Sequence, residues 1–419
     1  MNINIKHLFK GDKVIWAVFF LLSAVSVVEV FSASSTLTYK SQNYLGPISY
    51  HTAMIVMGIV VTIFTHHIPC RYFKLLTLFM LAFSFLALLW VLAWGESING
   101  ANRVISLVGF TFQPSEIAKG SMVLYTAHIL GAMQRETGAD RKALMYILPV
   151  LGFMVFFIGI ENLSTAALLV LVIWSMLFIG RIPKWQMLKL TGAGIALVVI
   201  GLTMVMTLGK VEEKENVENQ MTEAVIAAST VEQADKNSIK GGGLLHRMYT
   251  WRKRIIDFLN NEEVPPEEYD IAANYQVGHA NIAIASSDIT GKGPGNSTER
   301  DYLPQAFSDF IYAIIIEEMG IFGAIFVVFL YVVLLYRTAY IASRCENNFP
   351  AFLVMGLSVM LVVQAMANML VAVGVLPVTG QPLPLISKGG TSTIINCAYI
   401  GAILSVSRTA QVRNKEVKV

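Results

Sequence analysis

The 419-residue chain contains 55% hydrophobic and only 14% charged residues, whereas a soluble protein carries roughly 25% charged residues. This composition excludes nucleic-acid-binding proteins, cytosolic enzymes and secreted disulfide-rich scaffolds, and it predicts a polytopic membrane protein. The net charge of +3 is too small to indicate an anionic partner. The three cysteines form no CxxC pattern and the seven histidines show no ligand spacing, so the sequence assigns no metal ligand.

Long apolar segments recur along the chain, and a helix needs about 20 such residues to cross the hydrocarbon core of a bilayer. By that criterion the sequence predicts ten transmembrane helices, near residues 13–33, 50–66, 74–94, 115–133, 143–160, 163–180, 187–208, 310–336, 350–374 and 390–407. These segments are too long and unbroken for barrel strands, so the expected fold class is all-α. No cleavage site follows the first apolar segment, which we therefore expect to be a retained helix.

Lysine and arginine are distributed unevenly between the short connections, and cytoplasmic connections are the ones enriched in both. With a cytoplasmic N-terminus, seventeen fall on the inner side and only Lys40, Arg103 and Lys388 on the outer side. Both termini are therefore predicted to be cytoplasmic. The predicted organisation is transmembrane helices 1–7 over residues 1–208, a large extracytoplasmic loop over residues 209–308, and helices 8–10 with a cytoplasmic tail over residues 309–419.

The large outer loop has two parts of different character. Residues 210–243 are charged and poor in aromatic side chains, which indicates a mobile or partner-contacting arm. The stretch LLHRMYTWRKRIIDFL that follows has the pattern of an amphipathic helix at a membrane interface. Further on, ITGKGPGNST carries a Gly-x-Gly-x-Gly pattern after no predicted strand, so we reject a dinucleotide-binding fingerprint.

Charged side chains near the membrane are functional candidates, because each costs roughly 2.5–3.5 kcal/mol at mid-depth. The first group begins with Arg103 in an outer connection, and Pro114 marks the start of the next helix. Glu116 and Lys119 follow at a spacing that places them on one helix face. Two interpretations stay open: a local salt bridge that offsets the cost of burial, or a cationic pocket of Arg103 and Lys119 for a phosphate-bearing lipid, with Glu116 orienting the lysine.

The second group lies at the start of the eighth predicted helix. Asp309 stands at its mouth, and Glu317 and Glu318 lie roughly 12–13 Å further along a continuous helix. This separation is too large for Asp309 to share one proton-transfer event with either glutamate. Asp309 is interpreted either as a helix N-cap or as a functional carboxylate at the water boundary, and at least one of the glutamates is expected to pair with a neighbouring helix.

The third group is an irregular outer segment before the last helix. Three prolines and four glycines between Gly374 and Gly390 break any helix there, and irregular backbone at membrane depth is tolerated only where it lines a cavity or packs within protein. Gly389, Gly390 and Ser392 open the last helix with unpaired backbone N–H groups, which makes an anion site alongside Lys388, the alternative being a simple turn.

These three groups, in this order, resemble the FtsW/RodA/SpoVE family, whose members are also called SEDS proteins. The matching segments are QPSEIAK (113–119), YLP-x-A-x-SDFIYA-xxx-EE-x-G (302–320), Gln364 with Asn368, and LPVTG-x-PLPLIS-x-GG-x-S (376–392), supported by NGANR (99–103), ENLSTA (161–166) and GKGPGNS (291–297). The similarity covers nearly the whole chain. It implies a peptidoglycan glycosyltransferase, a hexosyltransferase that polymerises lipid II at the outer face of the cytoplasmic (inner) membrane and releases a polyprenyl diphosphate.

The resemblance also implies roles for individual residues. Asp309 matches the aspartate expected to act as general base on the acceptor hydroxyl. The substrate and diphosphate are expected to contact Arg103, Lys119, Glu116, Lys388 and Ser392. Supporting roles fall to Glu317, Glu318, Gln364, Asn368, Gly389 and Gly390. The resemblance fixes no cofactor, and a divalent cation, Mg²⁺ or Mn²⁺, is an alternative source of positive charge.

The chain departs from the family pattern at three places, the first of which is ENLSTA (161–166), where relatives usually have Pro-Asp-Leu-Gly-Thr-Ala. Relatives commonly have an acidic residue and a His-Thr pair before the aspartate, where this chain has Gln305, Ala306 and Phe307 before Ser308. A tyrosine common before the double glycine is Lys388 here, which adds a candidate phosphate contact.

Implied partners are lipid II and polyprenyl-linked glycan, a class B penicillin-binding protein with transpeptidase activity, and other divisome membrane proteins, at the division septum. Nucleic acid is not among them. The segments LPVTG-x-PLPLIS and RKRIIDFL favour a role in cell division over one in elongation and cell shape. Two alternative functions stay open: a flippase for lipid II, and a non-catalytic scaffold that activates a transpeptidase.

Overall fold

The computed structural model describes residues 9–34, 46–98, 101–107, 110–227, 244–259, 275–303 and 306–416. The chain divides into two compact units, one of Met1–Glu96, Asn102–Pro183 and Ile271–Val419, the other of Ser97–Ala101 and Lys184–Asp270. The helices of the first unit are α2 (Lys13–Ala33), α4 (Gly46–His67), α5 (Cys70–Trp94), α6 (Pro114–Ala132), α7 (Lys142–Glu161), α8 (Leu163–Ile179), α11 (Tyr275–Ala285), α12 (Ile311–Ala342), α13 (Asn348–Ala372) and α14 (Thr391–Glu416), with a 3₁₀ turn at Glu299–Asp301.

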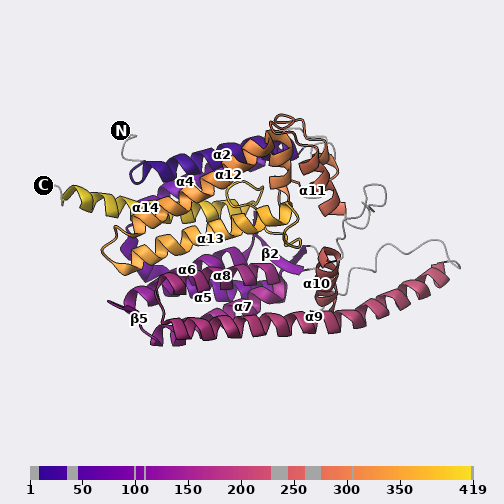
Figure 1. Cartoon of the computed structure of the whole chain (residues 1–419), viewed down its shortest axis with the longest axis horizontal. Helices are drawn as coiled ribbons and strands as arrows, with labels where there is room; N and C mark the ends of the chain where they lie inside the picture. The colour runs from indigo at the N-terminus through magenta and orange to yellow at the C-terminus, as the bar shows by residue number, and fades with distance from the viewer. Residues whose placement is uncertain are drawn as a thin grey trace. The chain divides into compact units, whose positions relative to one another are not determined.

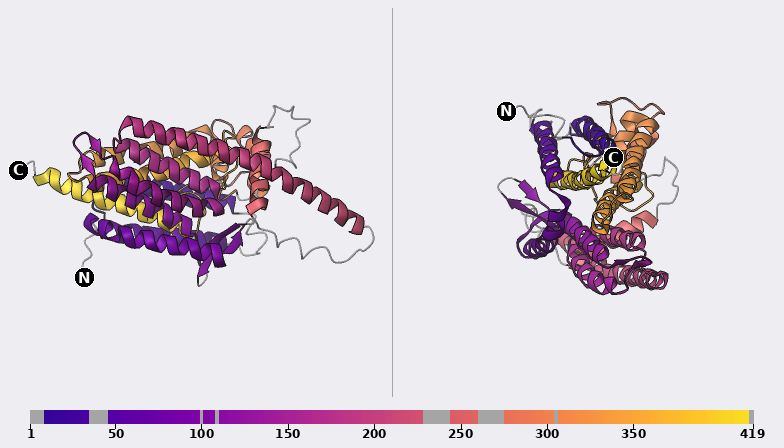
Figure 2. Two further views of the ribbon diagram at one scale, coloured as in Figure 1. Left: turned by 90° about the horizontal axis from the view of Figure 1, so that it is seen from below. Right: turned by 90° about the vertical axis from the view of Figure 1, so that its left-hand side faces the viewer.

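The long helices of the first unit run along a common direction, as Figures 1 and 2 show. At its centre is α13, which packs against α6, α8, α12 and α14. The pairs α4–α14, α2–α12 and α5–α6 complete the bundle. Because α13 is surrounded by other helices, polar side chains on it must find partners inside the protein.

Polar caps and ion pairs tie the helix ends to one another. The side chain of Asp12 accepts hydrogen bonds from Val14 N (2.9 Å) and Ile15 N (3.2 Å) and so caps α2. The same carboxylate pairs with Arg337 Nε of α12 at 2.8 Å. Asn162 caps α8 in the same manner, through Ser164 N and Thr165 N. Pro114 occupies the first turn of α6, as predicted, where its missing N–H leaves no bond unmade.

All ten predicted transmembrane segments coincide with helices. Within the described ranges, seven helices are long and apolar enough to cross a membrane: Lys13–Ala33, Ser49–His67, Cys70–Trp94, Lys142–Glu161, Lys184–Thr207, Ile311–Ala342 and Asn348–Ala372. Leu163–Ile179 is apolar but shorter. The chain is therefore a mostly helical membrane protein with many spans, while the count of ten and the assignment of the two sides stay predictions.

The expectation of an all-α fold needs one correction, because short strands are also present. They are β1 (Glu96–Ile98), β2 (Ala101–Leu107), β3 (Phe110–Phe112), β4 (Gln134–Arg135) and β5 (Gly138–Ala139). The hairpin of β2 and β3 pairs Ile105 with Phe112 and Leu107 with Phe110. Alternating side chains in the NRVISL stretch favour a strand, a local pattern that the search for long apolar segments does not detect.

The second unit contains α9 (Lys184–Ala227) and α10 (Leu244–Leu259), which contact each other. The predicted seventh transmembrane helix ends at residue 208, but α9 continues beyond it and remains helical to Ala227. The role of residues 210–243 as a mobile or partner-contacting arm stays a prediction. Glu, Lys, Gln and Ala, which are frequent in this stretch, are strong helix formers, so helix propensity extends the span. Residues 228–243 lie outside the described part. The amphipathic segment predicted after them is helical over its whole length, as α10.

Candidate active site

Asp309 lies in a turn directly before α12. The N-cap of that helix is Phe310, and it makes no side-chain capping bond. The carboxylate of Asp309 accepts a hydrogen bond from Ser308 Oγ at 2.9 Å, and its side chain is partly exposed. Capping of the helix N-terminus therefore does not account for an aspartate at this position.

The irregular segment 373–390 passes directly beside Asp309. Asn368 Nδ2, on α13, donates to the carbonyl oxygens of Asp309 (2.8 Å) and Gln381 (2.7 Å), so one amide joins the two stretches of chain. Gly380 has a φ of +66°, and a Cβ placed on it would lie 3.4 Å from Asp309 Oδ2. A glycine at this position therefore permits both the backbone conformation and the close approach to the carboxylate.

Further hydrogen bonds hold the segment 373–390 in place. Ser387 Oγ donates to the carbonyl oxygen of Ser308 at 2.6 Å. Gln381 Nε2 donates to Thr165 Oγ1 on α8 at 2.8 Å, and Tyr331 of α12 donates to the carbonyl oxygen of Pro384. The prediction of irregular backbone packed within protein is thus confirmed. The backbone carbonyls of Gln381, Pro382 and Pro384 accept hydrogen bonds from side chains of α12 and α13, as backbone buried away from water requires.

Lys388 extends from the end of this segment toward the turn that holds Asp309. Its backbone N–H donates to the carbonyl oxygen of Phe307 at 2.9 Å, and its ammonium lies 5.0 Å from the centre of the Phe307 ring. Partial burial lowers the pKa of the Lys388 ammonium from its usual value. A cation and a carboxylate thus lie on neighbouring stretches of chain at this edge of the bundle.

The last helix begins close to Lys388. Gly389 and Gly390 precede its first residue, Thr391, and Ser392 N donates to the carbonyl oxygen of Gly389 at 2.9 Å. Gly390 has a φ of +48°, and Ser392 is buried. A double glycine thus opens the last helix beside Lys388, as predicted, but the backbone N–H of Ser392 is paired with Gly389 and is not one of the unpaired donors expected there.

Glu116 and Lys119 form the predicted local salt bridge, with 2.9 Å between Oε1 and Nζ. Lys119 Nζ also donates to Gln364 Oε1 at 2.8 Å, and Gln364 Nε2 donates onward to the carbonyl oxygen of Pro382 at 3.2 Å. Glu116 and Lys119 are each only 2% exposed. The lysine therefore links α6 to the segment 373–390 through α13. Arg103 lies in β2, and its side chain is outside the described part of the chain.

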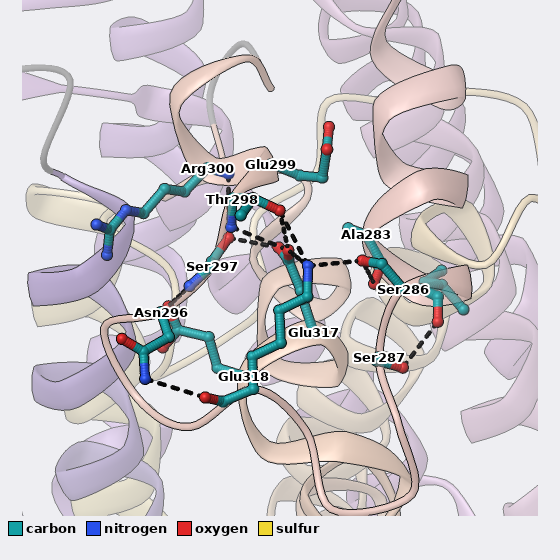
Figure 3. A network of polar contacts seen from close by, with 12 residues as sticks. Ala283, Ser286, Ser287, Asn296, Ser297, Thr298, Glu299, Arg300, Glu317 and Glu318 are labelled. Atoms are coloured by element: carbon teal, nitrogen blue, oxygen red, sulfur yellow. Dashed lines mark hydrogen bonds and ion pairs between the residues drawn. The ribbon is translucent and has the colours of Figure 1, made fainter.

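Glu317 and Glu318 bind the glycine-containing loop 291–298, as Figure 3 shows. Glu317 Oε1 accepts hydrogen bonds from Lys292 Nζ (2.6 Å), Thr298 N (3.0 Å) and Thr298 Oγ1 (2.9 Å), and its other oxygen accepts from Ser297 Oγ. We call Lys292, Ser297, Thr298, Glu317 and Glu318 the clamp. At least one of the glutamates was expected to pair with a neighbouring helix, and this is confirmed for Glu318 by Ser32 of α2, while the ionic partner of Glu317 comes from the loop.

Glu318 completes the clamp from the adjacent position. Its carboxylate accepts from Gly295 N at 3.0 Å and Ser297 N at 3.2 Å, and Ser32 Oγ of α2 also donates to it. Both glutamates are fully buried. Every hydrogen bond named here uses a carboxylate as acceptor, so both side chains hold the loop in place.

A break in α12 makes room for the clamp. Gly320 has φ +67° and ψ −168°, which interrupts the helix directly after the two glutamates. The carbonyl oxygens of Glu317 and Glu318 are thereby released from the helix and accept hydrogen bonds from Lys292 N (2.9 Å) and Gly293 N (2.8 Å). A Cβ on Gly320 or on Gly291 would overlap the backbone of the other segment. Gly291 of the Gly-x-Gly-x-Gly pattern therefore serves close backbone packing, whereas Gly293 and Gly295 share its positive φ without a backbone contact at the Cβ position.

Several residues of this region did not stand out in the sequence. Thr165 and Gln381 are uncharged, so the search for charges near the membrane does not find them. Lys292, Ser297 and Thr298 of the clamp lie in a loop that the sequence predicts to be in water, where polar residues are ordinary. Glu29 on α2 could have been found by the rule that singled out Glu116, because it is an ionisable residue within a span. It is fully buried, and neither of its carboxylate oxygens has a hydrogen-bond partner among the residues that the structure describes.

Comparisons with known proteins agree with the motifs. The model of the cell cycle protein family that groups FtsW, RodA and SpoVE matches residues 12–412. The probable peptidoglycan glycosyltransferase FtsW of Coxiella burnetii is 26% identical over 403 residues, which cover 94% of this chain and 95% of that protein. The protein of the same name from Pseudomonas fluorescens is 29% identical over 400 residues, with 92% and 85% covered.

Solved structures share the fold. The rod shape determining protein RodA of Thermus thermophilus superposes with a TM-score of 0.58 at 20% identity, covering 96% of this chain and 97% of that chain. A chain from the structure of a peptidoglycan synthase complex gives a TM-score of 0.67 at 21% identity, with 96% and 99% covered.

Proposed function

Because this chain belongs to the FtsW/RodA/SpoVE family of cell cycle proteins, we propose that it is a peptidoglycan glycosyltransferase that polymerises lipid II at the outer face of the membrane. One observation carries the assignment of the site. Of the acidic side chains in the matched motifs, Glu116, Glu317 and Glu318 are buried and already engaged, whereas Asp309 is partly exposed at the start of α12. A carboxylate that must reach a substrate hydroxyl requires this kind of exposure.

Asp309 acts as the general base in this proposal. Its carboxylate takes the proton of the acceptor sugar hydroxyl while the hydroxyl oxygen forms a bond to the anomeric carbon of the donor. The bond from that carbon to the lipid diphosphate breaks, and a polyprenyl diphosphate leaves with the electron pair. General-base catalysis contributes roughly 10²–10⁴-fold to such a step.

Lys388 and the start of α14 are proposed to meet the diphosphate. Negative charge grows on the leaving group, and a fixed cation beside helix N–H groups stabilises it. Lys119 is proposed to act from a distance, since its ammonium is occupied by Glu116 and Gln364 and it reaches the segment 373–390 through Gln364. A divalent cation was the alternative source of charge. Among the described residues no group of three His, Cys, Asp or Glu side chains could hold one, and the divalent cation stays an untested alternative.

The test is polymerisation of lipid II by purified Asp309→Asn protein with its partner transpeptidase. We expect a loss of roughly 10²–10⁴-fold without a change in thermal unfolding. Asp288→Asn is the matched control, because Asp288 is an exposed aspartate of a neighbouring loop, and it should retain full activity.

Three results would contradict the assignment, and each points elsewhere. Retained polymerisation by Asp309→Asn rules out the general base. Transport of lipid II across vesicles by the wild-type protein without polymerisation supports a flippase. Full complementation of cells by Asp309→Asn supports a scaffold that activates a transpeptidase.

We further propose that the protein acts in cell division together with a class B penicillin-binding protein. The curated relatives quoted above carry the name FtsW, and one structural neighbour belongs to a peptidoglycan synthase complex. Depletion of the protein should produce filaments. Round cells would instead indicate a role in elongation.

A further inference from the structure

Figure 1 shows that α2 begins and α14 ends at the same end of the first unit. A cavity of about 590 Å³ lies at this end. Its lining comes from the residues before α2, the start of α5, the connection between α12 and α13, the first turn of α13, and residues 406–410 of α14. This end holds the connections that are predicted to face the cytoplasm, away from Asp309. The volume is within the range of roughly 300–1,000 Å³ that small-molecule sites occupy.

Three cations line this cavity: Lys10, Arg344 and Arg408. None of the three forms an ion pair with a carboxylate of the described residues. The guanidinium of Arg344 lies 3.9 Å from the centre of the Tyr340 ring, and Arg408 Nη2 donates to the carbonyl oxygen of His67 at 3.4 Å. Glu346 is the one acidic residue in the lining, so the cavity carries a net positive charge.

Two helices also begin at the cavity without side-chain caps. The N-cap of α13 is Asn347, which lines the cavity, and its side chain makes no capping bond. The N-cap of α5 is Pro69, which has no side chain able to accept one, and the first residue of that helix, Cys70, also lines the cavity. Both helix N-termini add positive potential to that of the three cations.

We propose that this cavity binds a phosphate-bearing anion, the headgroup of an anionic phospholipid. Arginine guanidinium groups match the geometry of phosphate oxygens, and basic pockets between transmembrane helices on the cytoplasmic side suit such headgroups. The cavity lies at the ends of helices, which is the level of the headgroups. Free phosphate has the same recognition chemistry, so the experiment separates the two sources. The proposal does not depend on the glycosyltransferase activity.

The chain provides a native reporter of occupancy. Of its three cysteines, Cys70 and Cys397 are buried, whereas Cys345 is partly exposed and lines the cavity. Partial burial raises the pKa of the Cys345 thiol to about 11, so its reaction with a maleimide is slow enough to follow. A bound headgroup should protect it further. Cys345→Ser identifies any labelling at the other two positions.

The experiment measures the maleimide labelling rate of full-length protein in three preparations: phosphatidylcholine vesicles, the same vesicles with added inorganic phosphate, and vesicles that also contain phosphatidylglycerol. We expect phosphatidylglycerol to slow labelling roughly tenfold, the protection expected when the ligand is at about ten times its Kd. The rate in each preparation is divided by the rate in phosphatidylcholine for the same variant, which cancels direct effects of a substitution on the thiol.

Arg344→Gln and Arg408→Gln should each reduce the protection severalfold. Arg135→Gln is the control, because Arg135 is an exposed cation on the same predicted side that pairs with Asp140 outside the cavity. Equal protection in all variants would show a surface effect of anionic vesicles and overturn the proposal. Protection by inorganic phosphate alone would overturn the lipid source, and no protection by either would overturn the site.

Discussion

Two groups of carboxylates lie at the same end of α12, and their surroundings differ. In the clamp, Glu317 and Glu318 are fully buried and accept hydrogen bonds from a lysine, hydroxyl groups and backbone N–H groups. At the turn before the helix, Asp309 is partly exposed, its carboxylate accepts from the neighbouring Ser308, and its main chain is held by Asn368.

This difference distinguishes acids that build the site from the acid proposed to react in it. A carboxylate buried among many donors is stabilised in its charged form and makes a poor base, whereas a partly exposed carboxylate can receive a proton from a substrate without loosening the structure. Position along the helix does not separate the two kinds, since all three residues lie within ten positions of each other. Their partners separate them.

The largest effect is expected from removing the centre of the clamp. Glu317→Leu leaves the Lys292 ammonium and the Thr298 N–H without their acceptor, which should cost about 3 kcal/mol of stability and inactivate the protein by releasing loop 291–298. Thermal unfolding in detergent measures the change. A cycle with Lys292→Met should show strong coupling, because the two residues are in direct contact. An unchanged unfolding temperature would mean that the clamp does not hold the loop.

A substitution at the helix break should be nearly as damaging. Gly320→Ala adds a Cβ that overlaps the backbone of the loop at a φ of +67°, and about 2–3 kcal/mol is expected. Gly295→Ala is the matched control, because its φ is +86° but no atom lies within 4 Å of the added Cβ. It should cost only about 1–2 kcal/mol. Equal effects at the two glycines would show that strain alone, without the close packing, decides the outcome.

The hydrogen bonds by which Asn368 holds the main chain of Asp309 should affect the stability of the protein less than its rate of polymerisation. Asn368→Leu removes the donor to the carbonyl oxygens of Asp309 and Gln381 and should cost about 2 kcal/mol. Polymerisation should fall while its pH profile keeps its shape. In the Asp309→Asn background, Asn368→Leu should reduce the remaining polymerisation rate very little, since both substitutions act through the positioned carboxylate of Asp309. A full additional loss would show that Asn368 acts independently of the aspartate.

Substitution of Lys388, the cation beside Asp309, should change the polymerisation rate, whereas substitution of Lys292 in the clamp should change stability. Lys388→Gln should slow polymerisation about tenfold, equivalent to about 1.4 kcal/mol. Because burial lowers the pKa of Lys388, its charge is lost at a lower pH than that of an ordinary lysine, and activity should decline on the alkaline side. Lys388→Arg should move that decline to higher pH, since a guanidinium keeps its charge. An alkaline limb that stays in place in Lys388→Arg would assign the titration to another group.

The smallest effect is expected at Glu29, the buried acid without hydrogen-bond partners. Glu29→Leu removes two buried oxygens that accept no hydrogen bond, so stability should be unchanged or slightly higher, within about 0.5 kcal/mol. Comparing the stability changes of Glu29→Leu and Glu317→Leu isolates the contribution of hydrogen-bond partners, because both acids are fully buried. A large destabilisation would reveal a partner of Glu29.

Much of the fold follows from local features of the sequence. Apolar length alone places all ten predicted segments on helices, and Pro114, Pro382 and Gly390 mark where helices begin or cannot form. Local rules were less successful where two patterns overlap. The extension of α9 to Ala227 is decided by helix propensity against a charged composition, and the β2–β3 hairpin is too short for a search based on spans.

The sequence by itself determined that this is a helical membrane protein of the FtsW/RodA/SpoVE family, with Asp309 and Lys388 among its unusual charges, because hydropathy and motif spacing are local properties. Only the tertiary structure decided which of the charged side chains are already paired with other groups of the protein. The partners of Lys119 and Glu318 include Gln364 and Ser32, which are 245 and 286 residues away. Such pairs depend on how helices pack, and a carboxylate engaged in packing looks the same in sequence as one available to react.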